Sequence, residues 1–477
     1  MYRRGRHAWP TVMLLVLIIV LTLPAGWLLA PAFVGPPSVE TPEIPSWQRV
    51  PASLSARQGL SPLTDSAPVP LPAAVASQLE PVLKPDGGGT FTGLVQDAST
   101  GLVLFDRGGS ENRIPASNMK LLTAVAALRA IGPDERFSTR VLAGSSPEQV
   151  VVTGGGDVLL GAGESEQDQV MGHAGLATLA AATVAALRES GATGELKVLV
   201  DDSLFSGPPL NPAWASGDVE AGEVAPLYPL ALNSARFDPA VTTGPRPQDS
   251  AITAAEAFTA QLRAAGAAAG LTVAAGVGRY TATPDTTPTV LAEVHSATVA
   301  EQVDLMLQTS DNYLAEVLGR MAAAAEGQPA SSDGAAATVR AQLTELGIPT
   351  DAMRLADVSG LALDNQVSAR QFAEVVRAIT SGTDLRLRAA LAGFPVAGVT
   401  GTLDARYGDS STARGAGLVR AKTGTLNSVI ALSGYVVDAD GRLLVFSFIG
   451  NGLTPGAAGN KEALDRAATA LAACGCR

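Results

Sequence analysis

A serine and a lysine stand three positions apart in the stretch PASNMKLLTAVAAL, residues 115–128. If a helix begins here, positions three apart lie on one face, so Lys120 would lie beside Ser117. Such a pair could act as nucleophile and general base if the lysine were neutral, which requires its pKa to fall from about 10.4 towards about 7–8. The pattern alone is weak, because serine is also a favoured N-cap residue. We expect Ser117 to cap this helix, and the rest of the chain decides whether it also reacts.

A second lysine motif lies near the C-terminus. Lys422, Thr423 and Gly424, followed by Thr425, belong to the strand-like run GLVRAKTGTL. A cation at position 422 would help to lower the pKa of the first lysine. The glycine removes a side chain where the backbone of an extended substrate could approach the strand. Alone, the motif is equally typical of a surface lysine on an edge strand.

A third motif, Ser310-Asp311-Asn312, interrupts the helix-rich stretch QTSDNYLAE. Alone it is typical of a polar break or a helix N-cap. Its functional interpretation is a Ser310 hydroxyl that relays a proton and an Asn312 carboxamide that orients a substrate amide, with Asp311 in a structural role.

The order of the three motifs is more specific than any one of them. S-x-x-K, S-x-N and K-T-G follow one another in this chain, a combination typical of penicillin-binding proteins and class A β-lactamases. Lysine is scarce, and of the five present only Lys120 has a serine three residues before it, while another heads K-T-G. Coincidence is therefore the poorer explanation.

The elements around these motifs predict an α+β fold in which both chain ends form one antiparallel sheet flanked by helices. FTGLVQD and LVLFDR flank the turn ASTG as a hairpin, and three strand-like runs and a helix close the sequence. We expect a catalytic domain at residues 76–140 and 285–477. Residues 141–284, where short strands alternate with an alanine-rich helix, would form one or two small inserted α/β domains.

The N-terminal segment, residues 1–34, is predicted to be a targeting element. A basic start precedes the uncharged run TVMLLVLIIVLTLPAGWLLAPAFV. About 20 residues of helix cross the ~30 Å hydrocarbon core, so an uncleaved membrane anchor is one interpretation. Pro24 and Gly26 favour the other, a signal peptide cleaved near Ala30-Pro31-Ala32. In both cases the rest of the chain is exported, after a Pro/Ser-rich spacer at residues 35–75.

Two cysteines, Cys474 and Cys476, stand at the end of the sequence. A pair this close could form a strained bridge at best, and two thiols alone make no zinc site. We expect a frayed tail and no disulfide framework.

Several other activities are disfavoured. The net charge is -12 with no basic patch outside the N-terminus, which argues against nucleic-acid partners. The chain has three histidines, no G-x-S-x-G elbow and no H-E-x-x-H, which argues against a Ser-His-Asp hydrolase and a metallopeptidase. No motif calls for a metal or another cofactor.

At the three motifs the sequence closely resembles the D-alanyl-D-alanine carboxypeptidase/endopeptidase family, the class C low-molecular-weight penicillin-binding proteins of the S13 type. The resemblance covers most of the chain after residue 76, in the segments NRIPASNMKLLTAVAAL, GGGDVLL, VLVDDSLFSGPPLNPAW, LMLQTSDNYLAEVL, DVSGLALDNQVSARQ and VRAKTGTLNSVIALSGYV. Val358 stands where the family usually has glycine, and the inserted segment is short for the family. The resemblance implies a β-lactamase/transpeptidase-like catalytic domain.

The resemblance also implies residue roles. Ser117 would attack the carbonyl of a D-Ala-D-Ala or cross-link peptide bond in a peptidoglycan stem peptide, and Lys120 would take its proton. Ser310 would pass a proton to the leaving amine, and Asn312 would hold the acyl side-chain amide. The last motif would bind the substrate carboxylate, through Lys422 and Thr423. The backbone N–H groups of Ser117 and Thr425 would hold the oxyanion, and β-lactams would be covalent inhibitors.

Two rival functions remain open at this point. A β-lactamase is the nearer one, although the sequence has no E-x-x-L-N segment and is much longer than those enzymes. A non-catalytic cell-wall-binding module on the same fold is the other. Intact Ser117, Lys120 and Ser310 argue against a binder, because binding needs neither a base nor a relay.

Overall fold

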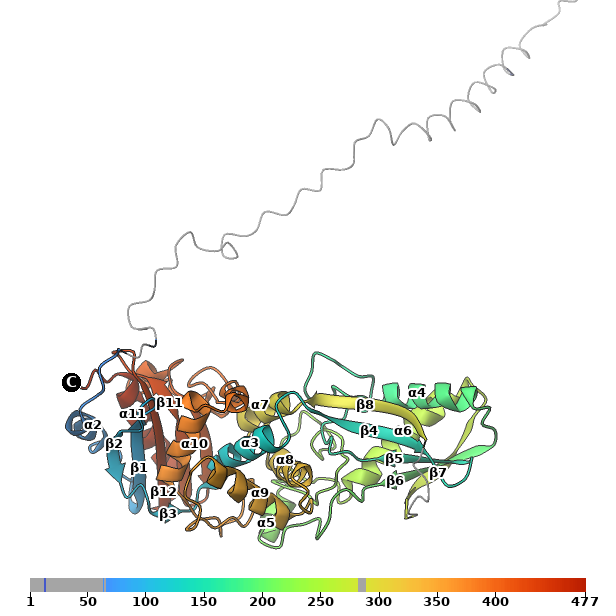
Figure 1. Ribbon diagram of the computed structural model, residues 1–477, viewed down its shortest axis with the longest axis horizontal. Coiled ribbons are helices and arrows are strands. Elements are labelled where there is room, and N and C mark those ends of the chain that lie inside the picture. The colour runs from blue at the N-terminus through green and yellow to red at the C-terminus, as the bar shows by residue number, and fades with distance from the viewer. Residues whose placement is uncertain (1–12, 14–62, 64–65, 282–288) are drawn as a thin grey trace, which may run out of the picture. The chain divides into compact units, whose positions relative to one another are not determined.

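The structure, a computed structural model, describes residues 13, 63, 66–281 and 289–477 (Figure 1). The predicted targeting element, residues 1–34, lies outside the described residues apart from Met13, as does most of the predicted spacer. A helix, α2 (Pro72–Leu79), begins inside the last part of that spacer, so regular structure starts before residue 76. Within the described ranges, no helix combines the length and the apolar composition that a membrane span needs.

The first sheet is built from the two sequence ends, as predicted. Its strand order is β10-β11-β12-β1-β2, and each neighbouring pair is antiparallel. The strands are β1 (Gly88–Asp97), β2 (Val103–Arg107), β10 (Arg420–Leu426), β11 (Val429–Val437) and β12 (Leu443–Thr454). The predicted α+β fold and its first hairpin are therefore confirmed.

Helices cover both faces of this sheet because side chains along its strands alternate between them. Ala431, Val445 and Ile449 join the larger core with helices α3 (Met119–Ala130), α7 (Val299–Thr309), α8 (Asn312–Ala325), α9 (Ser332–Glu345) and α10 (Ala369–Ser381). Leu432 and Phe448 face the other way, onto α2 and α11 (Lys461–Ala472). Two short strands, β3 (Asn112–Arg113) and β9 (Val367–Ser368), pair with each other beside this core.

Local sequence signals explain where the helices near the motifs begin. α7 and α10 start with capping boxes, in which Thr298 pairs with Glu301 and Ser368 with Gln371. Asp311 is the N-cap of α8, and its side chain accepts a hydrogen bond from the Leu314 N–H. Only two residues therefore separate α7 from α8: Ser310, and Asp311, the N-cap of α8.

A second, mixed sheet lies in the middle of the chain, with the order β7-β6-β5-β4-β8. Its strands are β4 (Arg136–Ala143), β5 (Gln149–Thr153), β6 (Glu195–Asp201), β7 (Thr272–Arg279) and β8 (Val290–Thr298), and β5-β6 and β6-β7 are parallel. Helices α4 (Leu176–Glu189) and α6 (Ser250–Ala267) share its core, and α5 (Ser216–Glu220) lies between β6 and α6 in the sequence. This sheet extends beyond the expected 141–284 at both ends. The number of inserted domains stays a prediction.

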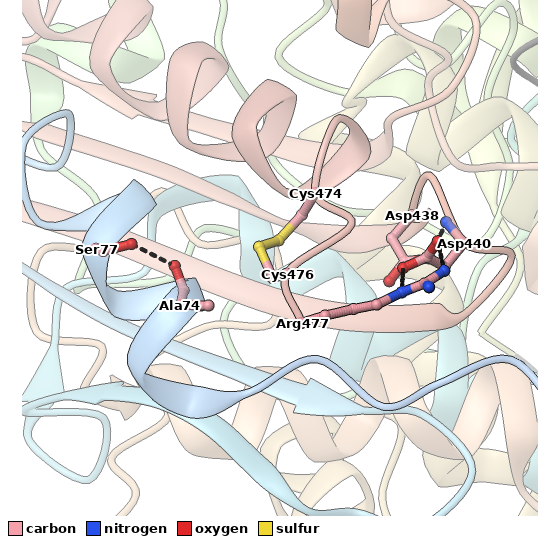
Figure 2. Close-up of a disulfide and its surroundings, with 7 residues drawn as sticks. All are labelled: Ala74, Ser77, Asp438, Asp440, Cys474, Cys476 and Arg477. Carbon is pink, nitrogen blue, oxygen red and sulfur yellow. Dashed lines mark hydrogen bonds and ion pairs between the residues drawn. A yellow bond between two sulfur atoms is a disulfide. The ribbon is translucent and has the colours of Figure 1, made fainter.

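The expectation of a frayed C-terminal tail was wrong. Cys474 and Cys476 form a disulfide, and Cys474 is buried (Figure 2). The Cys476 carbonyl accepts a hydrogen bond from the Leu71 N–H at 2.7 Å, and Arg477 forms an ion pair with Asp440. The tail is ordered because it packs on α2. This contact could not be predicted from the sequence, because α2 lies about 400 residues before the tail.

Ser117 lies in a 3-10 turn, Ala116–Asn118, directly before α3. Neither this turn nor α3 has a side-chain cap, so the expectation that Ser117 caps the helix was also wrong. Ala116 has a φ of 47°, a backbone conformation that a non-glycine residue rarely adopts. The turn that presents the serine is therefore held by its surroundings.

Two glycines provide those surroundings. A Cβ at Gly424 would lie 2.9 Å from the Pro115 carbonyl oxygen and 3.2 Å from the Ser117 nitrogen. At Gly360, which has a φ of +87°, a Cβ would overlap the Ala116 carbonyl group. Strand β10 and the loop after Val358 can therefore approach the turn from two sides only because both positions are glycine.

We predict that Gly360→Ala lowers the thermal unfolding temperature and the reactivity of Ser117 more than Gly347→Ala does. Gly347 has a similar φ of +75°, but a Cβ there would meet nothing within 4 Å. Gly347→Ala should therefore cost only the backbone strain of a positive φ, about 1 kcal/mol. Any additional effect of Gly360→Ala then measures its clash with the turn that carries Ser117. Equal effects of the two substitutions on both readouts would show that the close approach does not matter.

Candidate active site

The three motifs meet at one cavity of about 800 Å³. Five of the eight predicted site residues line it: Ser117 from the turn before α3, Ser310 and Asn312 from the α7–α8 junction, and Thr423 and Thr425 from β10. The other three, Lys120, Lys422 and Gly424, are buried beside the cavity. Residues about 300 positions apart in the sequence thus form a single polar site.

Lys120 is fully buried and touches three oxygen atoms. Its Nζ lies 3.0 Å from Ser117 Oγ, 2.6 Å from Asn312 Oδ1 and 2.7 Å from the Ser359 carbonyl oxygen. The Asn312 amide is oriented because its Nδ2 donates to the Glu223 carbonyl at 3.0 Å. Two of the three neighbours of Nζ can only accept hydrogen bonds, whereas the serine hydroxyl can also donate one.

Burial lowers the pKa of Lys120 to about 8, although Asp357, Asp311, Glu316 and Glu223 partly oppose it by stabilising the ammonium form. A neutral amine has two N–H donors and one lone pair. It would donate to Asn312 and Ser359 and accept the Ser117 proton. The geometry therefore suits a lysine that abstracts the serine proton.

Lys422 is also fully buried, and its Nζ lies 2.9 Å from Ser310 Oγ and 3.0 Å from the Thr423 carbonyl oxygen. Burial, and then the charge of Lys120, lower its pKa. Ser310 has a left-handed backbone with φ 60°, at the point where α7 ends. Side-chain contacts therefore link the second motif to the third, through Ser310 and Lys422, and the first motif to the second, through Lys120 and Asn312.

The predicted role of the K-T-G strand changes in detail. Lys422 does not line the cavity, but Thr423 does, and its Oγ1 lies 2.7 Å from Thr402 Oγ1. The close neighbour of Gly424 is the Ser117 turn, whereas the sequence had suggested a ligand backbone. The surface open to a ligand at this edge therefore consists of threonine hydroxyls, with the lysine behind them.

The sequence did not predict the loop at residues 357–362, whose Ser359 carbonyl contacts Lys120 Nζ. Asp357 accepts hydrogen bonds from the Gly360 and Ala362 N–H groups and from Asn365 Nδ2, at 2.6–2.8 Å. Glu316 accepts from the Val358 and Ser359 N–H groups at 3.0 and 2.8 Å, and burial raises its pKa to about 7, with Asp357 adding to the rise. In the sequence, the only sign of this loop is that its segment DVSGLALDNQVSARQ resembles the family. A single carboxylate such as Asp357 or Glu316 has no characteristic spacing that would predict its role.

Two arginines that no motif pointed to also line the cavity. Arg236 and Arg246 come from the segment between β6 and α6, and Arg236 Nη1 lies 2.8 Å from Asp311 Oδ2. Nothing in their sequence neighbourhood marks them as site residues.

Comparison with known proteins identifies the family. The model of the D-Ala-D-Ala carboxypeptidase 3 (S13) family matches residues 75–259 and 241–471. The chain is 34% identical to carboxypeptidase DacB of Mycolicibacterium smegmatis, over 100% of this chain and 98% of that protein. It is 35% identical to a carboxypeptidase of Mycobacterium tuberculosis, over 88% of each chain.

A solved structure has the same fold. Penicillin-binding protein 4 of Haemophilus influenzae superimposes with a TM-score of 0.64 at 21% identity, covering 83% of this chain and 97% of that one. The family model and the full-length relatives decide the assignment: this chain belongs to the D-Ala-D-Ala carboxypeptidase 3 (S13) family.

Proposed function

We propose that this chain hydrolyses the bond between the two terminal D-alanines of peptidoglycan stem peptides through an acyl-enzyme on Ser117. The observation that carries the proposal is the contact between a fully buried Lys120 amine and Ser117 Oγ, at 3.0 Å on the floor of an open cavity. A structural lysine would be paired with a carboxylate, but the three hydrogen-bond partners of this amine among the described residues are neutral oxygens.

The first step forms the acyl-enzyme. Ser117 Oγ attacks the carbonyl carbon of the penultimate D-alanine while its proton moves to Lys120 Nζ. Negative charge develops on the carbonyl oxygen, which the N–H groups of Ser117 and Thr425 stabilise in this proposal. Donors of this kind contribute about 10²–10³ in rate. Water later attacks the ester and restores the serine hydroxyl.

The leaving D-alanine needs a proton on its nitrogen as the peptide bond breaks. Ser310 passes on the proton that Lys120 took from Ser117, and Lys422 Nζ, 2.9 Å away, holds Ser310 Oγ. Thr423 and Thr402 hydroxyls receive the substrate carboxylate at the cavity wall, with the charge of Lys422 behind them. Asn312 lies at the same wall, where it orients the acyl-side amide.

The same step explains two related proposals. A β-lactam presents a strained amide and a carboxylate, so it acylates Ser117 and remains attached because water attacks the bulky ester slowly. A cross-link peptide bond to D-alanine differs from the terminal bond only in its leaving amine, so D,D-endopeptidase activity uses the same residues. The cavity of about 800 Å³ is at the upper end of ligand pockets, which suits a branched peptide.

Peptidoglycan lies outside the cytoplasm, so the enzyme acts on the outer side of the membrane. We propose that residues 1–34 serve as its export signal or membrane anchor. Fractionation followed by N-terminal sequencing of the mature protein distinguishes a retained anchor from a cleaved signal peptide.

We predict that Ser117→Ala abolishes D-alanine release from a peptide ending in D-Ala-D-Ala, with a loss of at least about 10³-fold in kcat. The alanine removes the nucleophile but leaves the turn and the cavity in place. Ser410→Ala, at an exposed position, is the matched control and should keep wild-type kinetics. Released D-alanine is measured over time for each variant. Hydrolysis that survives in Ser117→Ala would place the nucleophile elsewhere.

We predict that the rate of acylation rises with pH up to a midpoint near 8 and then levels off. Lys120 must lose its proton to act as the base, and burial holds its pKa at about 8. Below the midpoint the rate should fall tenfold for each pH unit. Second-order rate constants for benzylpenicillin, measured from about pH 6 to 10, give this profile. A flat profile would mean that Lys120 is not the titrating base.

Lys120→Arg should lose acylation by about 10²–10⁴-fold at every pH, because guanidinium stays protonated. Lys197→Arg, on an exposed position of β6, should leave both the rate and the midpoint unchanged.

A further inference from the structure

The S-x-N motif is bound by a segment of chain far from it in sequence, residues 222–250. Asp311 pairs with Arg236 at 2.8 Å, and Asn312 Nδ2 donates to the Glu223 carbonyl at 3.0 Å. The hydroxyl of Tyr313 accepts from the Tyr228 N–H and lies 3.0 Å from Ser250 Oγ. Three consecutive residues, 311–313, are therefore each held by this segment, which we call the 222–250 segment.

The part of the 222–250 segment that carries Arg236 has an unusual backbone. Asn233, Ser234 and Ala235 all have positive φ values, 52°, 56° and 53°. Three such residues in a row persist only where their surroundings over-determine them, which is common at functional sites. Arg246 supplies part of that support, since its guanidinium donates to the Ser234 carbonyl at 2.9 Å and to the Gly222 carbonyl at 2.5 Å. This strained turn directly precedes Arg236 and places its side chain within ion-pair distance of Asp311.

The Arg236–Asp311 pair is nearly closed to water. The side chain of Asp311 is 3% exposed and that of Arg236 is 13% exposed. Burial opposes ionisation of Asp311, but Arg236, Arg246 and the hydrogen bond from the Leu314 N–H together outweigh it and lower the pKa of Asp311. Because the carboxylate also caps α8, its position fixes the residues on either side of it, Ser310 and Asn312.

We infer that Arg236 is a positioning residue for catalysis: its ion pair with Asp311 sets the S-x-N motif against Lys120 and balances the Asp311 charge near that amine. The inference rests on the proposed function, in which Lys120 is the base. It assigns the 222–250 segment a part in the catalytic machinery, beyond shaping the cavity wall.

The charges that face Lys120 make this inference measurable. Its ammonium form is favoured by four carboxylates, those of Asp357, Asp311, Glu316 and Glu223. The Lys422 amine and the Lys120 amine repel each other when both are charged, which disfavours the ammonium form. Without Arg236, the negative charge of Asp311 would act on Lys120 with less compensation. The amine would hold its proton to higher pH, and acylation would need a more alkaline solution.

The test is the pH profile of benzylpenicillin acylation in the full chain. Arg236→Gln should move the midpoint upward by at least about 0.5 unit and lower kcat for peptide hydrolysis more than it raises KM. Asp311→Asn should move the midpoint downward, because it removes the anion but keeps a helix cap. The double variant, Arg236→Gln with Asp311→Asn, should bring the midpoint back towards wild type. Arg263→Gln, at an exposed position on α6, is the control that should change nothing.

A merely structural role predicts a different result. Arg236→Gln would then lower the unfolding temperature and the active fraction, with an unmoved midpoint in the molecules that still acylate. That outcome overturns the inference, and so does a change confined to KM, which would mean direct contact with substrate. If Arg236→Gln does not fold, the test rests on two other variants. Asp311→Asn should then still lower the midpoint, and Arg236→Lys, which keeps the positive charge, should keep the wild-type midpoint. Failure of the proposed function looks different again, since the wild type itself would not be acylated.

Discussion

The burial of one amine is the constraint on which the site depends. Lys120 lies wholly inside the protein among the oxygens of Ser117, Asn312 and Ser359, and no carboxylate of the described residues is in hydrogen-bond contact with it. Removing an ammonium group from water is costly unless it is paired, so the neutral form gains and the pKa falls to about 8. The same three contacts give the lone pair only one partner that can donate a proton, the serine hydroxyl. Burial thus accounts for both the base that we propose and the direction of its lone pair.

The elements around this amine serve to keep that arrangement in place. Gly360 and Gly424 allow a loop and a strand to close on the strained turn that carries Ser117. Asp357 and Glu316 organise the loop whose carbonyl faces Lys120, and Asn312 is oriented from the other side by the Glu223 carbonyl. These supports come from both halves of the chain that form the first sheet and, through Glu223, from the segment between β6 and α6, so residues in the middle of the chain also hold the site.

The sequence alone predicted the motifs and the fold but missed most of these supports. Fixed spacing and motif order predict the site residues Ser117, Lys120, Ser310, Asn312 and Thr423, and these predictions meet at one cavity. The sheet was predicted correctly because strand patterns stand at both chain ends. The contacts of Glu316 and Arg236 depend on tertiary packing, which leaves no local pattern. The predicted cap role of Ser117 was wrong because Ser117 lies inside a 3-10 turn and Asn118 occupies the N-cap position of α3. The predicted frayed tail was wrong because the Cys476 carbonyl accepts a hydrogen bond from the distant Leu71 N–H.

The central claim is that Ser117 becomes acylated. The most direct test is to treat the folded chain with benzylpenicillin, digest it, and locate the penicilloyl group by mass spectrometry. We predict a single modified peptide that contains Ser117, and no modification in Ser117→Ala. Modification of another residue such as Ser310, or no adduct and no drug turnover in a demonstrably folded sample, would contradict the account.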